Sequence, residues 1–368
     1  MLVSTIKSGE VISKSSPSNQ SELVELCPSS DARWDEFVSA HPDATVYHHS
    51  AWTQFLADAY GHTPLYLGLM SADGHRLLGV LPLLFVDSLL TGKRLVSLPF
   101  TSYCNPLMPQ SRLEDALSYA LNRFRGVRYV ELKLLNLPGE KTDHDRLSVE
   151  SPFVSQILRL PEDLEELFRS FHNTSIRQMV RRARRDGLVV RLASSEAELR
   201  RFYELEVRLR RSQGLPTPPY KFYAGMRRAL SPKGLFELPV VEFRGNIIAA
   251  AVVLKWPSGW HLEYTASDPV YHKHGANQLL AWECIKRAHQ EGIRVFDFGR
   301  TSLWHRSLLM YKDRWQTRRY PIRYRYFPDN AKRPGWRDIS GSLLVRLNKR
   351  LPLAALEWEG RRIYPHRS

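Results

Sequence analysis

The sequence predicts an α/β fold built from two similar halves, each a mixed, mainly antiparallel sheet flanked by helices. The same order of elements occurs twice along the chain: helix, strand, turn, two further strands, helix and closing strand. The turns "SADG" and "RGN" between strands are typical of antiparallel hairpins. Each closing strand follows a helix through a short loop that contains Gly, which is typical of a parallel pair. We interpret this repetition as an internal duplication.

Helices are expected where apolar residues recur every three to four positions, and strands where apolar residues run between turn residues. In the first half these patterns predict helix 50–61, strands 65–70, 77–86 and 93–100, helix 113–124 and strand 127–135. In the second half they predict helix 198–214, strands 236–243, 247–256 and 259–267, helix 276–292 and strand 293–299. The apolar run 77–86 is about half as long as a bilayer span, so we interpret it as a buried strand.

The length of 368 residues favours two domains. A leader rich in Ser and Lys and a polar stretch with Pro and Gly at 137–152 indicate where the domains begin and end. The predicted organisation is a flexible leader at 1–20, a first domain at 21–150, a second, catalytic domain at 151–330 and a basic amphipathic tail at 331–368.

The charge balance favours anionic partners. The chain has 53 Lys and Arg against 38 Asp and Glu, a formal net charge of +15. Such a field attracts RNA, acidic lipid headgroups or phosphorylated metabolites, and it does not choose among them. The three cysteines are far apart and form no CxxC pair, so neither disulfides nor a zinc site is predicted, and a cytoplasmic location is expected.

Five arginines lie in "NTSIRQMVRRARRDG" at 173–187, which is predicted to be one helix. Apolar residues recur along this segment at the spacing of one helix face. Arg177, Arg181 and Arg184 each come one residue after one of them, so they are expected at the edge of the buried face. A guanidinium placed there is partly desolvated and suited to bidentate contact with phosphate. Arg182 and Arg185 point further out, where a solvated face is an equal alternative.

The segment "HKHGAN" lies between a predicted strand and the helix at 276–292. His272, His274, Gly275 and Asn277 resemble in spacing a turn that holds pyrophosphate at a helix N-terminus. An ordinary strand-to-helix loop is the alternative. No metal is predicted, because these histidines have no further ligands at metal-binding spacing.

Asp297 lies in "VFDFGRTS" at the end of the last strand of the repeat. Alternation places Asp297 on the face opposite Phe296 and Phe298, among apolar neighbours and near the edge where open α/β sheets bind ligands. With a pKa raised by burial, the carboxyl group would orient or deprotonate an amine. Alternatively it accepts backbone N–H bonds from the turn that follows. No nucleophile elbow or comparable motif is present, so covalent catalysis is not expected.

Three segments in this order carry a family resemblance: "NTSIRQMVRRARRDGLVV", "YTASDPVYHKHGANQLLAWECIKRAHQEGIRVFDFGRTS" and "LLMYKDRW". Together with segments of the first half, they resemble the Fem-type peptidoglycan-bridge aminoacyltransferases and the FemAB-like proteins of exopolysaccharide and PEP-CTERM systems, within the GNAT acyltransferase superfamily. The resemblance covers about residues 30–330. It implies two GNAT-like domains in tandem, and an N-acyltransferase in which an amine attacks an acyl carbonyl carried by acyl-CoA or aminoacyl-tRNA.

The resemblance also implies roles for particular residues. Lys312 would stabilise charge near the reacting carbonyl, and Tyr264 and Asp297 would complete the catalytic groove. The substrate, a phosphorylated or lipid-linked saccharide or peptide acceptor, would meet Arg177, Arg181, Arg300 and Ser302. The donor would meet the "HKHGAN" turn, and no tightly bound cofactor is implied.

Two alternatives from other classes remain open. A non-catalytic protein that binds RNA or other polyanions would use the charge alone, and an envelope-assembly scaffold would depend on the tail. The tail, with "SGSLLVRLNKRLPLAALEWEGRRIYP", mixes Leu and Trp with Arg and Lys. It either lies on an anionic membrane at the inner face, as amphipathic basic segments do, or packs on the first domain.

Overall fold

The computed structural model describes residues 21–88, 92–135, 148–331 and 342–364. They form two compact units. Unit 1 contains the described residues up to 149 together with 323–331, and unit 2 contains 150–322 and 342–364. The predicted leader and most of the predicted boundary segment lie outside the described residues.

Unit 1 begins with an edge strand and two short helices and continues with a meander of three strands. Its elements are β1 (Ser21–Leu26), α1 (Arg33–Ala40), η1 (Val46–His48), α2 (Ser50–Tyr60), β2 (Thr63–Ser71), β3 (Leu77–Ser88), β4 (Gly92–Val96), α3 (Gln110–Arg123) and β5 (Val130–Leu135). The pairs β1–β2, β2–β3 and β3–β4 are antiparallel, whereas β4 and β5 are parallel. A core of Leu, Val and Ala side chains from α3 and the strands holds this unit together.

Unit 2 repeats this order of elements with longer helices. Its elements are β6 (Ser148–Arg159), α5 (Leu164–Ser170), the π-helical η2 (Asn173–Arg177), α6 (Gln178–Arg185), β7 (Val189–Leu192), α7 (Glu196–Gln213), α8 (Tyr220–Leu230), η3 (Ser231–Lys233), β8 (Phe236–Glu237), β9 (Pro239–Phe243), β10 (Asn246–Leu254), β11 (Trp260–Ser267), η4 (Pro269–His274), α9 (Ala276–Gln290), β12 (Val295–Ser302), α10 (Arg306–Asp313), β13 (Arg318–Phe327), α11 (Leu343–Asn348) and α12 (Leu353–Ile363). The first residues of β6 belong to unit 1, and β13 leaves unit 2 after Ile322, so that its last residues lie in unit 1.

The strand pairing of unit 2 matches that of unit 1. The pairs β7–β9, β9–β10 and β10–β11 are antiparallel, and β12, which follows the helix α9, pairs in parallel with β11. The predicted antiparallel turns and parallel closing strands are therefore confirmed in both units. Beyond β12 the sheet of unit 2 continues with β6, which is antiparallel to β12.

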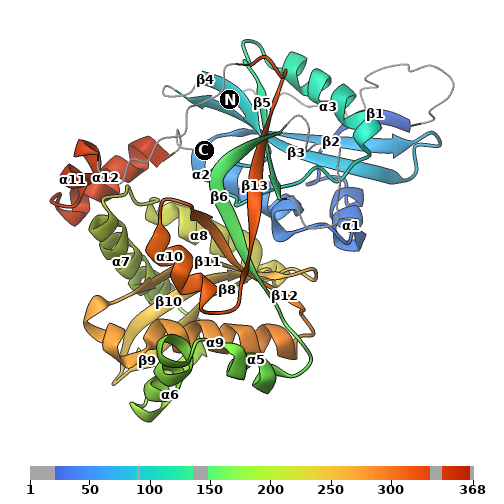
Figure 1. Cartoon of the computed structure of the whole chain (residues 1–368). Helices are drawn as coiled ribbons and strands as arrows, with labels where there is room; N and C mark the ends of the chain where they lie inside the picture. The colour runs from blue at the N-terminus through green and yellow to red at the C-terminus, as the bar shows by residue number, and fades with distance from the viewer. Residues whose placement is uncertain (1–20, 89–91, 136–147, 332–341, 365–368) are drawn as a thin grey trace. The chain divides into compact units, whose positions relative to one another are not determined.

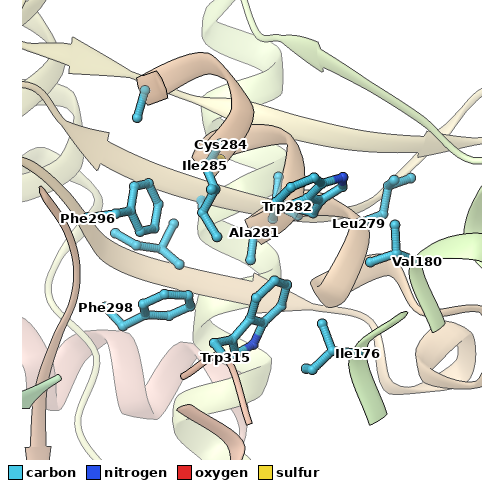
Figure 2. Close-up of a cluster of buried hydrophobic side chains, with 14 of the residues drawn as sticks. Ile176, Val180, Leu279, Ala281, Trp282, Cys284, Ile285, Phe296, Phe298 and Trp315 are labelled. Atoms are coloured by element: carbon cyan, nitrogen blue, oxygen red, sulfur yellow. The ribbon is translucent and has the colours of Figure 1, made fainter. Parts of the chain in front are cut away.

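A large apolar cluster holds the helices α6 and α9 against the sheet of unit 2. Figure 2 shows its centre, where Phe296 and Phe298 of β12 lie side by side and Phe298 lies next to Trp315, with ring centroids 5.7 Å apart; Trp282 of α9 belongs to the same cluster. In Figure 1, α6 and α9 lie on one side of these strands and α7 on the other. Phe296 and Phe298 both belong to this cluster, so the side chain between them points to the opposite face. The predicted face of Asp297 is thereby confirmed.

The predicted helix over 173–187 begins differently from the prediction. Its first turn is π-helical, with the N–H of Gln178 bonded to the carbonyl of Asn173. His172 caps this turn, because its Nδ1 accepts from the N–H of Ser175 at 3.3 Å. The helix ends at Arg185, before the left-handed Gly187.

The described part of the tail packs on unit 2, whereas packing on the first domain is one of the two alternatives that the sequence leaves open. Asn348 donates to the carbonyl of Gly214, at the end of α7. Gly360 of α12 lies so close to Thr217 that a Cβ on it would come within 1.9 Å of that residue's carbonyl oxygen. The close approach requires glycine and anchors α12 beside α7.

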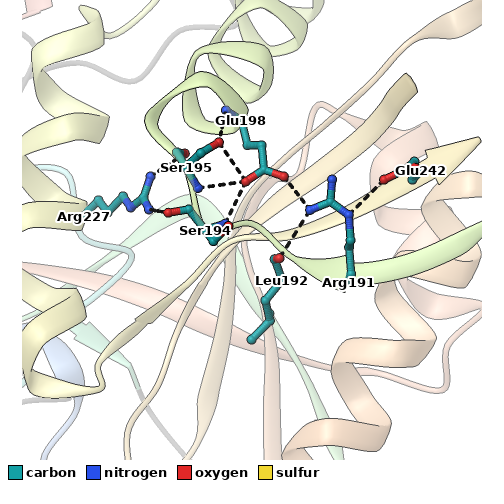
Figure 3. Close-up of polar contacts among 7 residues, drawn as sticks. All are labelled: Arg191, Leu192, Ser194, Ser195, Glu198, Arg227 and Glu242. Carbon is teal, nitrogen blue, oxygen red and sulfur yellow. Dashed lines mark hydrogen bonds and ion pairs between the residues drawn. The ribbon is translucent and has the colours of Figure 1, made fainter. Parts of the chain in front are cut away.

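An ion-pair network fixes the start of α7 to its neighbours (Figure 3). Ser195 caps the helix, and the carboxylate of Glu198 accepts from the backbone N–H groups of Ser194 and Ser195, both at 2.8 Å. Arg191 of β7 bridges Glu198 and Glu242. These donors, the N–H of Ser195 first and then Arg191, lower the pKa of Glu198 to about 2.

Replacing Glu198 by Ala should lower the free energy of unfolding by about 1 kcal/mol or somewhat more, because the capping box and the bridge to Arg191 are both lost. The folded pKa of Glu198 lies below the ordinary value of 4.5, so this stabilisation is present above pH 4.5 and disappears as the pH falls toward 2. Urea unfolding of both proteins across this range measures the difference. Glu204→Ala, on an exposed i,i+3 pair of the same helix, is the control and should change stability by only a few tenths of a kcal/mol.

Candidate active site

The parallel pairing between β11 and β12 stops early. Their ladder consists of Trp260 with Phe296 and His261 with Asp297, although the strands continue to Ser267 and Ser302. Side chains of unit 2 gather where the ladder ends. We call Ser155, His261, Asp297, Gly299 and Lys312 the ladder-end site.

Asp297 is the anion of the ladder-end site and is 1% exposed. Its carboxylate accepts from the hydroxyl of Ser155 at 2.7 and 2.9 Å and from the backbone N–H of Gly299 at 2.7 Å. Nδ1 of His261 lies 3.5 Å away. The expectation of apolar neighbours is therefore wrong: the neighbours are polar, and the side chain holds β6, β11 and the turn at Gly299 together.

The expectation that burial raises the pKa of Asp297 is wrong. Burial does act in that direction, but the contacts from His261, Ser155 and the N–H of Gly299 outweigh it and hold the pKa below its usual value. The carboxylate stays ionised at neutral pH, which makes it a weak proton acceptor. The alternative prediction, in which Asp297 accepts a backbone N–H from the turn that follows, describes the observed bond to Gly299.

Lys312 of α10 reaches the same site. Its Nζ donates to the carbonyl oxygens of Phe298 at 2.5 Å and Gly299 at 2.9 Å. Successive carbonyls of a regular strand point in opposite directions. Here the register with β6 shifts between Asp297 and Arg300, and Gly299 has a φ of 75°. This bulge turns two adjacent carbonyls toward one ammonium group.

An ammonium group has three donors, and Lys312 uses two of them on backbone carbonyls. Burial lowers its pKa to about 8, against the opposing effect of Asp297 and Glu263. Lys312 is thus mostly protonated at neutral pH, fixed in position and left with one N–H for a ligand. A fixed, desolvated cation of this kind stabilises a developing oxyanion.

Unit 1 has the corresponding strands but a different environment at its ladder end. The ladder between β4 and β5 also has two pairs, and Glu131 takes the place of Asp297. Beyond this ladder, residues 97–105 return to β5 and bond the part of its edge that β4 leaves unpaired. Lys133 donates its backbone N–H to Ser97 Oγ and accepts from the N–H of Cys104, and the Asn105 amide bonds both the N–H and the carbonyl of Leu135. In unit 1 this edge is therefore occupied by the unit's own chain.

The arginines of α6 divide by their contacts. Arg184 pairs with Glu283 at 3.0 Å, and Arg182 lies 3.7 Å from Asp186. Arg181 is exposed, with its guanidinium 5.9 Å from the ring centroid of Phe168. Arg177 is half-buried, and its Nε is shielded from solvent with no hydrogen-bond partner in the described part of the chain.

The four predicted donor-binding residues lie in η4 and at the start of α9, but they do not all meet at one point. His272 Nε2 and the Asn277 amide both meet the hydroxyl of Ser267, each at 2.9 Å. His274 instead lies 2.6 Å from Asp186. Gly275 is left-handed and packs against the carbonyl of Met179, 2.4 Å from the position of a Cβ. No side chain caps α9, and the predicted contact of a donor phosphate with its first N–H groups remains a prediction.

The remaining predicted residues lie outside the ladder-end site. The ring of Tyr264 lies 5.3 Å from that of Tyr223 in α8, as part of an aromatic cluster. Arg300 stacks over Phe153 at 4.5 Å. Ser302 accepts from the N–H of Trp304 at 3.3 Å and shapes the turn after β12. Their predicted contacts with substrate remain predictions.

Sequence reasoning missed Ser155 and His261. Ser155 lies on β6, 142 positions before Asp297, and pairs with it because β6 is antiparallel to β12. His261 is next to Asp297 through the parallel ladder. The alternation of β11 and β12 could have indicated His261, since closing strands align at their starts, but no sequence pattern indicated that β6 joins this sheet.

No three His, Cys, Asp or Glu side chains in the described ranges come together as a metal site. Likewise, no described helix is long and apolar enough to cross a membrane.

Residues 169–316 match the family model of the acetyltransferase (GNAT) domain. Four of the five residues of the ladder-end site lie in this range, and only Ser155 precedes it. The chain therefore contains an acyltransferase domain of the GNAT type. Its two units are tandem GNAT-like folds. No curated protein sequence matches the chain.

Among solved structures the chain is similar to FemX, with 16% identity and a TM-score of 0.66 over 82% of this chain and 96% of that one. It is also similar to a tandem GNAT protein from the clavulanic acid biosynthesis pathway, with 13% identity, a TM-score of 0.51 and coverage of 86% and 100%. The C-terminal domain of a putative lysylphosphatidylglycerol synthetase from Agrobacterium fabrum gives 11%, 0.52, and 80% and 90%. These likenesses confirm the predicted Fem-type resemblance at the level of the fold.

Proposed function

We propose that unit 2 transfers an acyl group from acyl-CoA or aminoacyl-tRNA to the amine of a phosphorylated or lipid-linked precursor of the cell envelope or of an exopolysaccharide. The observation that carries this proposal is Lys312, a buried ammonium with one spare donor at the end of the β11–β12 ladder. The names of two relatives support the acceptor class, because FemX is a Fem-type protein and lysylphosphatidylglycerol carries an aminoacyl group on a phospholipid.

The donor binds along the strand edges beyond the ladder. An extended chain with amide groups adds to a strand edge through main-chain hydrogen bonds, and the pantetheine arm of CoA is such a chain. Beyond His261 and Asp297 the two strands share no ladder pair, so their facing edges are the place for it. The phosphates of the donor then lie at the N-terminus of α9, where the first N–H groups have no side-chain cap.

In the transfer step the acceptor nitrogen forms a bond to the acyl carbonyl carbon. The carbonyl oxygen becomes negatively charged and is stabilised by the third N–H of Lys312. When this intermediate collapses, the bond from the carbonyl carbon to the donor sulfur or oxygen breaks. The proton that the amine loses ends on this leaving atom. Asp297 holds the bulge that orients Lys312, and its lowered pKa makes the carboxylate a weak acceptor for this proton.

Arg177 contacts a phosphate of the acceptor. Its shielded Nε is without a partner in the described residues, and a bidentate phosphate contact would satisfy it. Arg182 and Arg184 pair with Asp186 and Glu283. They add to the positive potential near the acceptor and do not contact it.

Titration of the protein with acetyl-CoA, longer acyl-CoA esters and aminoacyl-tRNA, at low and at physiological salt, tests the proposal. Saturable binding of one donor that persists at physiological salt is expected. Uncharged tRNA and free CoA are the matched controls for the acyl group. Weak, salt-labile binding of every polyanion alike would instead favour a polyanion-binding protein whose net charge explains its contacts.

A further inference from the structure

The two C-terminal helices have one face on unit 2 and one face in solvent. On α12, Leu356, Gly360 and Tyr364 are buried. Trp358 lies on the opposite side and is 58% exposed. On α11, Val345 is buried, whereas Leu347 is 52% exposed. The buried residues of α12 recur every four positions, so its two faces are well separated.

The exposed faces are basic. Every Lys and Arg of the described tail is exposed: Arg346, Lys349, Arg350, Arg361 and Arg362. Its two acids, Glu357 and Glu359, are half-buried, and one oxygen of Glu359 is shielded from solvent. The cations therefore point outward and the anions toward the protein. We call the five cations with Leu347 and Trp358 the tail surface.

We propose that the tail surface binds an anionic phospholipid bilayer. Cations alone would suit any polyanion, but Leu347 and Trp358 expose large apolar groups among them, and transfer of an aliphatic and an aromatic side chain into the acyl boundary of a bilayer is favourable. The Arg362 guanidinium lies 4.6 Å from the ring centroid of Trp358. A tryptophan with an adjacent arginine fits the bilayer interface, where the ring reaches the acyl boundary and the cation reaches phosphate. No helix of the described chain spans a bilayer, so this binding is peripheral.

This surface does not depend on the proposed reaction. The tail anchors on α7 through Gly214 and Thr217, and Tyr364 contacts Phe222 of α8, with ring centroids 6.1 Å apart. Bilayer binding would thus hold unit 2 itself at the membrane. It is measurable without knowledge of donor or acceptor.

Co-sedimentation of the full chain with vesicles tests the proposal. Vesicles of phosphatidylcholine mixed with phosphatidylglycerol should bind the protein at physiological salt, and pure phosphatidylcholine vesicles should not. The double substitution Arg361→Gln/Arg362→Gln should weaken partitioning roughly 10- to 30-fold, and Trp358→Ala roughly tenfold. All three positions are exposed, and thermal unfolding would verify that the variants stay folded.

The matched control is Arg228→Gln/Lys233→Gln, which removes two exposed cations elsewhere on unit 2. It should change partitioning by no more than about twofold, because distant exposed charges are screened at this salt concentration. An equal loss in the control, or full binding by the tail variants, would overturn the proposal. A parallel titration with a single-stranded RNA oligonucleotide tests whether the tail surface binds nucleic acid instead of a bilayer. If the tail substitutions abolished RNA binding and left vesicle binding unchanged, the tail surface would be a nucleic-acid site instead.

Discussion

Replacing Lys312 by Met is expected to lower kcat for acyl transfer by roughly 100- to 1,000-fold, the effect of removing an oxyanion donor from a desolvated site. Donor affinity should change by no more than about threefold, since the ammonium acts on charge that develops during the reaction. Steady-state kinetics with the donor identified by titration measure both quantities. Lys233→Met, on an exposed turn, is the control.

The pH dependence separates this role from a merely structural one. The pKa of Lys312 is lowered to about 8 by burial, and the protonated form is the active one. The wild-type rate should therefore fall above about pH 8, as the ammonium loses its proton. Lys312→Arg keeps a cation that does not titrate in this range, so any activity it retains should lack the falling limb. An unchanged kcat in Lys312→Met would contradict the assignment.

Asp297→Ala is expected to destabilise unit 2 by about 3 to 5 kcal/mol, because it leaves buried donors on Ser155, His261 and Gly299 without their acceptor. Ser155→Ala removes one of these bonds and should cost about 1 to 2 kcal/mol. Chemical unfolding of the three proteins gives these values. The folded pKa of Asp297 lies below the ordinary 3.8, so its stabilisation is present above pH 3.8 and is lost as the pH falls through the folded pKa.

Asp297→Asn tests the link to Lys312. The variant keeps the shape of the side chain but removes the negative charge that raises the pKa of Lys312. The falling limb of the rate profile should therefore move to lower pH than in the wild type. Should Asp297→Ala prove as stable as the wild type, or Asp297→Asn leave the profile unmoved, the proposed positioning role of Asp297 would be wrong.

Local patterns sufficed for much of the fold. The turns "SADG" and "RGN" and the Gly-containing loops before the closing strands predicted the order and direction of β2 to β5 and of β9 to β12. Alternation predicted that Phe296 and Phe298 face the apolar cluster and Asp297 the other side, as the structure has them. These features depend on neighbours within a few positions, which a single sequence displays directly.

Contacts between residues far apart in the sequence could not be predicted from local patterns. Ser155 meets Asp297 only because β6 joins the sheet of unit 2. This contact and the one with His261 lower the pKa of Asp297, whereas burial alone would raise it. The bulge at Gly299, which presents two carbonyls to Lys312, comes from a register shift that no local pattern indicates. The tail contains no signal that Gly360 fits against Thr217, so its docking on unit 2 could not be foreseen.

The two units differ at the ends of their parallel ladders, and this difference determines how many donor molecules the chain binds. In unit 1, Ser97, Cys104 and Asn105 bond the edge of β5, whereas in unit 2 the corresponding strand edges lie beside Lys312. One donor molecule should therefore bind per chain. The direct measurement is the stoichiometry of donor binding by isothermal titration calorimetry, with the acyl-CoA or aminoacyl-tRNA that binds saturably. One site per chain, retained in Lys312→Met, is the predicted result. Two sites per chain would show that unit 1 also binds donor and would contradict the account.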